Sequence, residues 1–202
     1  MKTFVFCGLS TSGKTMIVEA LKGNEIKLPI TQSIKDSIKK IGYLKKQVTT
    51  TDRVKRNGEI EGKDYYFVLT KTFEEKIENE EFFEHANVYG KNYGLTKKEM
   101  FDNLKSNSNY ALIMDPQGVA KVKAAFPTNV VSIYLDVDIE TVIRRLESER
   151  KESSDIIEIR STDLQYFYDY KDRCDFVVNA NNDINIVLKD VLEIMNNVLN
   201  EK

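Results

Sequence analysis

The sequence predicts an α/β fold in which a parallel sheet is covered by helices on both faces. Three observations support this prediction. Apolar runs typical of buried strands alternate along the chain with amphipathic segments typical of helices. A glycine-containing loop at residues 8–15 follows the first apolar run and opens the first helical segment. Residues 47–95 break the alternation with short strands, turn signals and many tyrosines, which predicts an inserted subdomain.

The order of the predicted elements favours one compact domain with insertions. The apolar runs that indicate buried parallel strands are 3–7, 110–114, 130–135 and 175–178. Helical spacing of apolar residues follows the loop at 16–21 and recurs at 31–41, 117–126, 138–149 and 184–199. Because parallel sheets bind ligands at the carboxyl ends of their strands, we expect functional residues to gather at that edge.

The loop at residues 8–15 matches the pattern G-x-x-x-x-G-K-[ST], which wraps nucleotide phosphates. Its glycines permit tight turns that point backbone N–H groups inward, and the dipole of the following helix adds to the site. Lys14 can reach the outer phosphates, and the Thr15 hydroxyl can ligate Mg²⁺. The loop residues expected to bind ATP are Gly8, Ser10, Thr11, Ser12, Gly13, Lys14 and Thr15.

The interruptions of the pattern predict how the chain is divided. We expect a P-loop core at 1–46, 96–144 and 161–202, the inserted subdomain at 47–95 and a small lid at 145–160. Within the lid, residues 149–157 are mostly polar and lie between predicted helices, as in segments that move. We interpret the extra helix near 31–41 as a solvated amphipathic helix and not as a binding element.

The composition is that of an ordinary globular protein, with 41% hydrophobic and 31% charged residues in a chain of 202. A formal net charge of −2 gives no electrostatic reason to expect nucleic-acid or membrane binding. The apolar run at the N-terminus is too short for a signal or membrane-spanning helix. Cys7 and Cys174 fall in predicted strands without metal-ligand spacing, which favours a reduced, cytoplasmic protein.

A second set of motifs begins in the inserted subdomain. In chain order they are Thr-Thr-Thr-Asp-Arg at 49–53, Arg-Asn-Gly-Glu at 56–59, Gly-Lys-Asp-Tyr-Tyr-Phe-Val at 62–68, Phe-Phe-Glu-His-Ala at 82–86, Tyr-Gly at 93–94 and Asp-Pro-Gln-Gly at 115–118. Their order and spacing resemble the guanylate kinase family, whose sequences run S-x-T-T-R-x-x-R-x-G-E-x-x-G-x-D-Y-x-F, then F-x-E, Y-G-[ST] and D-x-Q-G. The resemblance covers nearly the whole chain and implies that the insertion binds a nucleoside monophosphate.

The residue types suit the roles that the resemblance implies for the acceptor phosphate. Arg53 and Arg56 can clamp a phosphate with planar guanidinium forks, which a lysine cannot do. Tyr65 and Tyr93 can each donate a hydroxyl to the same phosphate, although isolated tyrosines are more often packing residues. The full set implied for GMP is Thr49, Arg53, Arg56, Tyr65, Glu84, Tyr93 and Asp115.

Glu84 and Asp115 are the base readers that the resemblance implies. Guanine offers N1–H and its N2 amino group as adjacent donors, and carboxylates supply acceptors for both. Adenine lacks these donors and would leave the carboxylates buried and unpaired, which discriminates strongly against it. Without the resemblance, Glu84 would be a surface acid and Asp115 a helix N-cap before Pro116.

Three arginines near the lid are implied to neutralise the transferring phosphoryl group, together with Lys14 and Arg53. Arg145 and Arg160 match the family spacing. Arg150 lies one place later than the family pattern R-L-x-x-R expects, and we expect a local shift to bring it into place. Asn179 matches the family's asparagine near the donor adenine; a plain turn residue is the alternative.

Two substitutions and one insertion depart from the family pattern. Leu95 replaces the Ser or Thr whose hydroxyl meets guanine O6, which should weaken guanine binding by about 1–3 kcal/mol. Ile113 replaces the first Asp of D-x-D-x-Q-G, which is expected to support the Mg²⁺ shell or the catalytic geometry. The segment before Thr49 is longer than usual.

These observations predict an ATP-dependent kinase that converts GMP or dGMP to GDP or dGDP with Mg²⁺. One alternative is a related kinase that uses another phosphorylated acceptor. The other is a non-catalytic guanylate-kinase-like module that binds a protein, which would not need Lys14 and Thr15 beside Arg53 and Arg56. We expect small-molecule nucleotides as partners and a monomer or homodimer.

Overall fold

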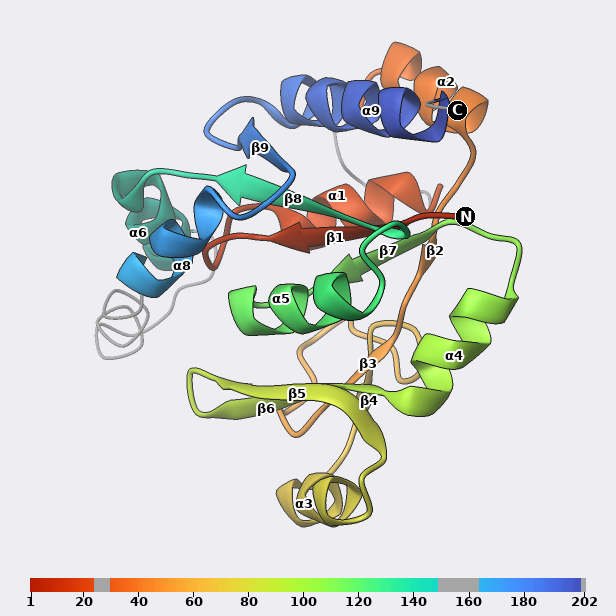
Figure 1. Ribbon diagram of the computed structural model, residues 1–202. Coiled ribbons are helices and arrows are strands. Elements are labelled where there is room, and N and C mark those ends of the chain that lie inside the picture. Colours follow the sequence, from red (N-terminus) through yellow and green to blue (C-terminus); the bar gives the residue numbers. More distant parts are fainter. Residues whose placement is uncertain (24–29, 149–163, 201–202) are drawn as a thin grey trace.

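A five-stranded parallel sheet forms the centre of the computed structural model, which describes residues 1–23, 30–148 and 164–200. Its strand order is β2-β7-β1-β8-β9 (Figure 1). The strands are β1 (Thr3–Cys7), β2 (Lys45–Lys46), β7 (Tyr110–Ile113), β8 (Val130–Asp136) and β9 (Phe176–Asn179). The predicted parallel α/β fold is confirmed. The short edge strand β2 was not predicted, and Cys174 lies in the turn before β9, not in a strand.

Helices cover both faces of this sheet, and β1 contributes to both apolar cores. Phe4 and Phe6 point into the core shared with α1, α2 and α9, whereas Val5 and Cys7 point into the core shared with α5. This alternation is the two-residue period of a fully buried strand. The helices are α1 (Lys14–Leu21), α2 (Gln32–Ile41), α5 (Pro116–Ala125), α6 (Ile139–Ser148), α8 (Leu164–Lys171) and α9 (Ile184–Asn200).

The extra helix α2 is amphipathic, as predicted, but it is not simply solvated. Its polar side faces solvent, while Ile34 and Ile38 are buried against α9. Figure 1 shows α2 and α9 together on the face of the sheet opposite α5. The segment therefore adds a layer to the core on the side away from the second sheet.

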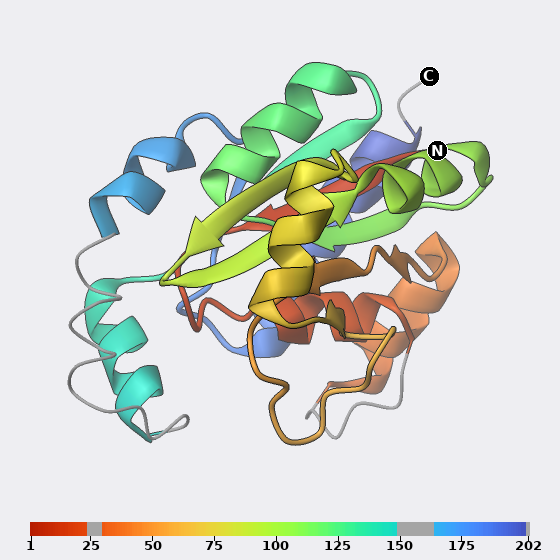
Figure 2. The same ribbon diagram turned by 90° about the horizontal axis from the view of Figure 1, so that it is seen from below.

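The insertion forms a second, four-stranded sheet with the order β4-β3-β6-β5 (Figure 2). Its elements are β3 (Thr49–Thr51), β4 (Tyr65–Phe67), α3 (Thr70–Glu78), β5 (Phe82–Val88) and β6 (Lys91–Thr96), and α4 (Lys97–Lys105) leads back to the core. β3 and β4 are parallel, and the other pairs are antiparallel. A parallel pair needs a long return connection, and that connection carries Arg53 and Arg56.

The described part of the chain contains no helix that is long and apolar enough to cross a membrane. The predicted division at residues 47 and 95 stays a prediction. Of the predicted lid, only residues 145–148 are described, as the end of α6.

Candidate active site

β1 leads directly into the predicted phosphate-binding loop, where two glycines have geometric reasons to be glycine. A Cβ atom on Gly8 would lie 2.5 Å from the carbonyl oxygen of Leu135 in the neighbouring strand β8. Gly13 has a left-handed φ of +94° and immediately precedes α1. Since Gly13 has no side chain to cap this helix, the first N–H groups of α1 stay available for phosphate oxygens.

The Lys14 side chain folds back over the loop. Its Nζ donates hydrogen bonds to the carbonyl oxygens of Gly8 at 2.8 Å and Leu9 at 2.6 Å, and to Ser12 Oγ at 3.2 Å. The ammonium group is therefore held at the centre of the loop. Ser12 is buried and supports Lys14 instead of lining the cavity described below.

Arg145 lies against the donor side of the site. Its guanidinium donates to the carbonyl oxygens of Thr11 at 3.0 Å and Ala180 at 3.3 Å, which ties α6 to the loop and to the turn after β9. Asn179 ends β9 beside this contact. Its Oδ1 accepts from the backbone N–H and the side-chain amide of Asn181, both at 3.0 Å, as in a turn residue. Its predicted contact with adenine stays a prediction.

One cavity of about 260 Å³ joins the two predicted sets of residues. The loop residues that line it are Gly8, Ser10, Thr11, Gly13, Lys14 and Thr15. The predicted acceptor residues that line it are Thr49, Arg56, Tyr65, Glu84, Tyr93 and Asp115. The fold thus places a phosphate-binding loop opposite an acceptor site, as direct transfer between two bound phosphates requires.

Tyr65 and Tyr93 stand together on the second sheet. Their rings meet edge to face, with centroids 5.9 Å apart. Burial, and then the neighbouring Tyr93, raise the pKa of Tyr65 to about 12. Its hydroxyl therefore stays protonated at neutral pH and can donate a hydrogen bond to an acceptor phosphate.

Arg53 does not line the cavity in this structure. Its guanidinium pairs with both carboxylate oxygens of Glu59, at 2.7 and 3.0 Å, and lies 5.3 Å from the centre of the Tyr65 ring. The Glu59 carboxylate also accepts from the backbone N–H of Arg56 at 2.7 Å. Glu59 therefore shapes the loop that carries both arginines, and the role of Arg53 as a phosphate clamp stays a prediction.

Glu84 and Asp115 reach the cavity from different elements, β5 and the N-cap of α5, and they converge on Gly118. A Cβ atom on Gly118 would lie 3.0 Å from Asp115 Oδ1 and 3.1 Å from Glu84 Oε1, so a side chain there would displace both carboxylates. Asp115 Oδ1 accepts from the Gly118 N–H at 2.9 Å. Glu84 is only 6% exposed, and its Oε2 has no hydrogen-bond partner among the described residues.

The two carboxyl groups are electrostatically coupled. Burial, and then repulsion from Asp115, raise the pKa of Glu84 to about 7. Burial also raises the pKa of Asp115, against the lowering effect of its hydrogen bonds from Gly118 and Tyr166. A ligand that donates a hydrogen bond to Glu84 Oε2 would satisfy a buried acceptor that has no partner among the described residues.

Leu95 and Ile113, the two departures from the family motifs, have different surroundings in the structure. Leu95 lies opposite Glu84 in the β5–β6 pair, but it is fully buried in the apolar core with Met100 and Leu112 and does not line the cavity. It therefore supplies packing where the family has a hydroxyl. Ile113 ends β7 and does line the cavity, so an apolar side chain stands where the family pattern has an aspartate.

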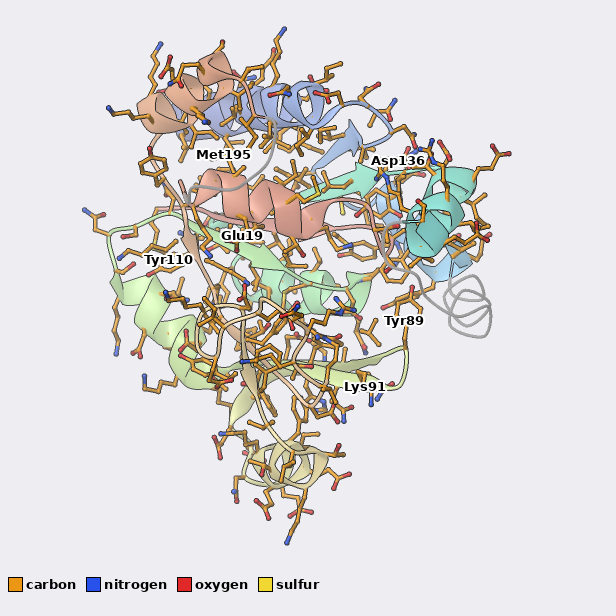
Figure 3. The ribbon with its side chains drawn as sticks, turned by 180° about the vertical axis from the view of Figure 1, so that it is seen from behind. Glu19, Tyr89, Lys91, Tyr110, Asp136 and Met195 are labelled. Carbon is orange, nitrogen blue, oxygen red and sulfur yellow. The ribbon has the colours of Figure 1, made fainter. Side chains whose placement is uncertain are left out.

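Two aromatic residues of the cavity were not predicted. Tyr89, in the β5–β6 turn with φ +53°, stacks on Phe167 of α8 with ring centroids 6.5 Å apart. Figure 3 shows Tyr89 at the end of the hairpin, with its ring directed toward the P-loop core. The Tyr-Gly pair at 89–90 indicates a turn, but its partner on α8 depends on tertiary structure. Arg150 and Arg160, two of the predicted catalytic residues, lie outside the described residues.

A phosphate-binding loop at the end of a central parallel strand, sharing one cavity with an acceptor-side sheet, defines a P-loop kinase of small molecules. Comparison with known proteins identifies the family. A profile of the family described as guanylate kinase matches residues 1–198. The chain belongs to the guanylate kinase family.

Individual relatives agree with this assignment. The guanylate kinase of Fusobacterium nucleatum is 34% identical over 150 residues, covering 74% of this chain and 80% of its own. That of Thiobacillus denitrificans is 28% identical over 195 residues, covering 96% and 85%. The crystal structure of guanylate kinase from Anaplasma phagocytophilum shares the fold, with a TM-score of 0.69 at 24% identity over 100% of this chain and 87% of that one.

Proposed function

We propose that this protein transfers a phosphoryl group from ATP to GMP or dGMP, giving ADP and GDP or dGDP. The observation that carries the proposal is the single cavity lined both by the phosphate-binding loop and by Glu84 and Asp115. The sequence similarity to guanylate kinases supports the same reaction. The predicted resemblance and enzyme class are thereby confirmed, and the role of each residue is our proposal.

On the donor side, the loop N–H groups and Lys14 bind the outer phosphates of ATP. We propose that Arg145, with Arg150 and Arg160, neutralises the charge that develops during transfer. For binding, Lys14 exchanges its bonds to the Gly8 and Leu9 carbonyls for bonds to phosphate oxygens.

On the acceptor side, Arg56, Tyr65, Tyr93 and Thr49 hold the phosphate of GMP, and Arg53 joins them from beside Tyr65. Glu84 and Asp115 accept hydrogen bonds from guanine N1–H and N2. Phosphoryl transfer depends chiefly on positioning and charge stabilisation, so the proposal needs no protein nucleophile.

The loop fits Mg²⁺ in the way that kinases usually hold it. Mg²⁺ binds through one or two protein oxygens together with substrate phosphates and water. The Thr15 hydroxyl, which lines the cavity next to Lys14, would supply the protein oxygen. Mg²⁺ would offset the charge of the donor phosphates. Because Ile113 offers no oxygen, we propose that this chain relies on Thr15, water and the phosphates.

The two alternatives are less well supported. A non-catalytic module has no use for Lys14 and Thr15 in the same cavity as the acceptor residues, yet both line it. A kinase for a different acceptor has no need of two converging carboxylates, one of which, Glu84, is buried with an oxygen that lacks a hydrogen-bond partner among the described residues. A cytoplasmic location and a monomeric or homodimeric state stay predictions, and gel filtration with light scattering tests the latter.

A coupled ADP-release assay across GMP, dGMP, AMP, CMP and UMP tests the proposed function. We expect turnover with the two guanine nucleotides and little with the others. Lys14→Ala should reduce kcat by roughly 10²-fold or more, whereas Lys22→Ala, at the other end of α1, should not. Turnover of another acceptor without any turnover of guanine nucleotides would support kinase activity and refute guanine nucleotides as the substrates.

A further inference from the structure

Tyr166 of α8 makes two contacts behind the base-reading carboxylate. Its hydroxyl accepts a hydrogen bond from the backbone N–H of Gln117 at 3.0 Å and is directed at Asp115 Oδ2, 3.5 Å away. Its ring meets Phe167 edge to face at 5.5 Å. Tyr166 is 47% exposed, and its hydroxyl contacts the first turn of α5.

The backbone geometry at the start of α5 explains why the Tyr166 hydroxyl of α8 finds a hydrogen-bond donor there. Pro116 has no N–H, so Gln117 and Gly118 carry the first free donors of the helix. Asp115 Oδ1 accepts from Gly118, which leaves the Gln117 N–H to the Tyr166 hydroxyl. That hydroxyl can accept from Gln117 and donate to Asp115 at the same time.

A second cavity of about 510 Å³ is lined by Asp115 and by Tyr166. Asp115 lines both cavities. Without the Tyr166 hydroxyl, Oδ2 would lose this contact and only the hydrogen bond from Gly118 to Oδ1 would remain, so the carboxylate would be held less firmly. Burial, and then Asp115, raise the pKa of Tyr166 to about 12, so the hydroxyl keeps its proton.

We propose that Tyr166 is a positioning residue that fixes the Asp115 carboxylate for recognition of the acceptor base. The inference rests on the proposed role of Asp115 in binding GMP.

Tyr166→Phe removes the hydroxyl and keeps the ring, and Tyr168→Phe is the matched control. Tyr168 is on the same helix, but its hydroxyl donates to the Val137 carbonyl oxygen at 3.3 Å and not to Asp115. Since the contact to Asp115 is long, we expect the effect of a single modest hydrogen bond. KM for GMP should rise about threefold to tenfold in Tyr166→Phe. The kcat at saturating GMP and the KM for ATP should stay within twofold, and Tyr168→Phe should match the wild type.

A double-mutant cycle separates positioning from general destabilisation. In an Asp115→Asn background, Tyr166→Phe should add no further rise in KM for GMP, because both changes act through the same carboxylate. Equal KM values in the two tyrosine variants, or additive effects with Asp115→Asn, would overturn the inference. If the wild type does not phosphorylate GMP at all, the proposed function fails, and that result is distinguishable from either outcome.

Discussion

Arg53 was predicted to bind the acceptor phosphate, but in the structure its guanidinium binds Glu59. Its two bonds to Glu59 show that the guanidinium already forms a planar fork with a carboxylate at the edge of the acceptor site. The same fork suits a phosphate. Our proposal for Arg53 is that its guanidinium exchanges Glu59 for the acceptor phosphate.

We expect Arg53→Lys to raise KM for GMP and lower kcat, by about tenfold combined in kcat/KM, even though the charge is kept. Lysine has no planar fork that can make two parallel hydrogen bonds to Glu59 or lie flat against Tyr65. Steady-state kinetics with Arg144→Lys, an exposed arginine on α6, as the control tests this. An Arg53→Lys enzyme with wild-type constants would show that the clamp lies elsewhere.

Glu84 gives the site a defined pH dependence. Its pKa is raised from 4.5 to about 7, so the folded protein binds a proton that the unfolded chain releases between these values. This contribution to stability is fully present below about pH 4.5 and is lost as the pH rises through 7. At 1.36 kcal/mol per unit, it amounts to about 3 kcal/mol. Guanine binding has the opposite pH dependence, because the N1–H and N2 donors of guanine bind the ionised Glu84 carboxylate.

We therefore expect KM for GMP to fall about tenfold between pH 6 and pH 8, as Glu84 ionises. The Glu84→Gln variant should bind GMP weakly and lose most of this slope, while keeping the part due to the GMP phosphate itself. Denaturant unfolding should show that its stability declines less between pH 5 and pH 8 than that of the wild type. A slope unchanged by Glu84→Gln would assign the titration to another group.

At the scale of elements, α2 and α9 form a layer on the face of the sheet opposite α5 and the second sheet (Figure 1). Ile38 of α2 is 3% exposed within this layer. We expect Ile38→Ala to lower the free energy of unfolding by about 2–4 kcal/mol and to leave kcat and both KM values unchanged at 25 °C. Ile186→Ala, at a half-exposed position of α9, is the control and should cost far less. A large loss of kcat in folded Ile38→Ala would mean that α2 supports the loop.

The elements that the sequence predicted well are those with a strong local pattern. β1, β7 and β8 are long apolar runs, and α9 has an extended apolar stripe, so their identity needed no tertiary information. β2 has two residues, both lysines, and is a strand only because β7 lies beside it. α4 and α8 carry few buried side chains, Met100 in one and Phe167 and Tyr170 in the other, and their patterns are correspondingly weak.

At the scale of the whole molecule, the donor and acceptor sites form one cavity. A bisubstrate analogue that joins adenosine and guanosine through a chain of phosphates should therefore bind both ends at once. We expect its Kd to be at least about 10²-fold lower than that of ADP or GMP alone, through effective concentration. Calorimetry with four, five and six phosphates would identify the best length. An affinity no better than the stronger single nucleotide would mean that the two ends cannot be occupied together.

The candidate site was predicted mainly through residue order, because the loop and acceptor motifs have fixed spacings. What the order of residues could not provide is the set of contacts between distant elements. Tyr89 against Phe167, Tyr166 against Asp115 and Arg145 against Thr11 each join segments that only the tertiary fold brings together. Leu95 illustrates the converse, since its place in the motif indicated the base but its side chain packs in the core.

The position of β1 in the middle of the sheet also has a consequence for synthesis of the chain. β1 is bonded on one side to β7 and on the other to β8, whose residues are made more than a hundred positions later. At about 5–20 residues per second, the ribosome needs about 6 to 25 s between β1 and β8. The Leu135 carbonyl of β8 packs directly against Gly8. The loop therefore cannot take its final form before β8 has emerged. The phosphate-binding loop, although encoded well before β8, is completed only with it, and nascent chains that end before β8 should not be retained on an ATP resin.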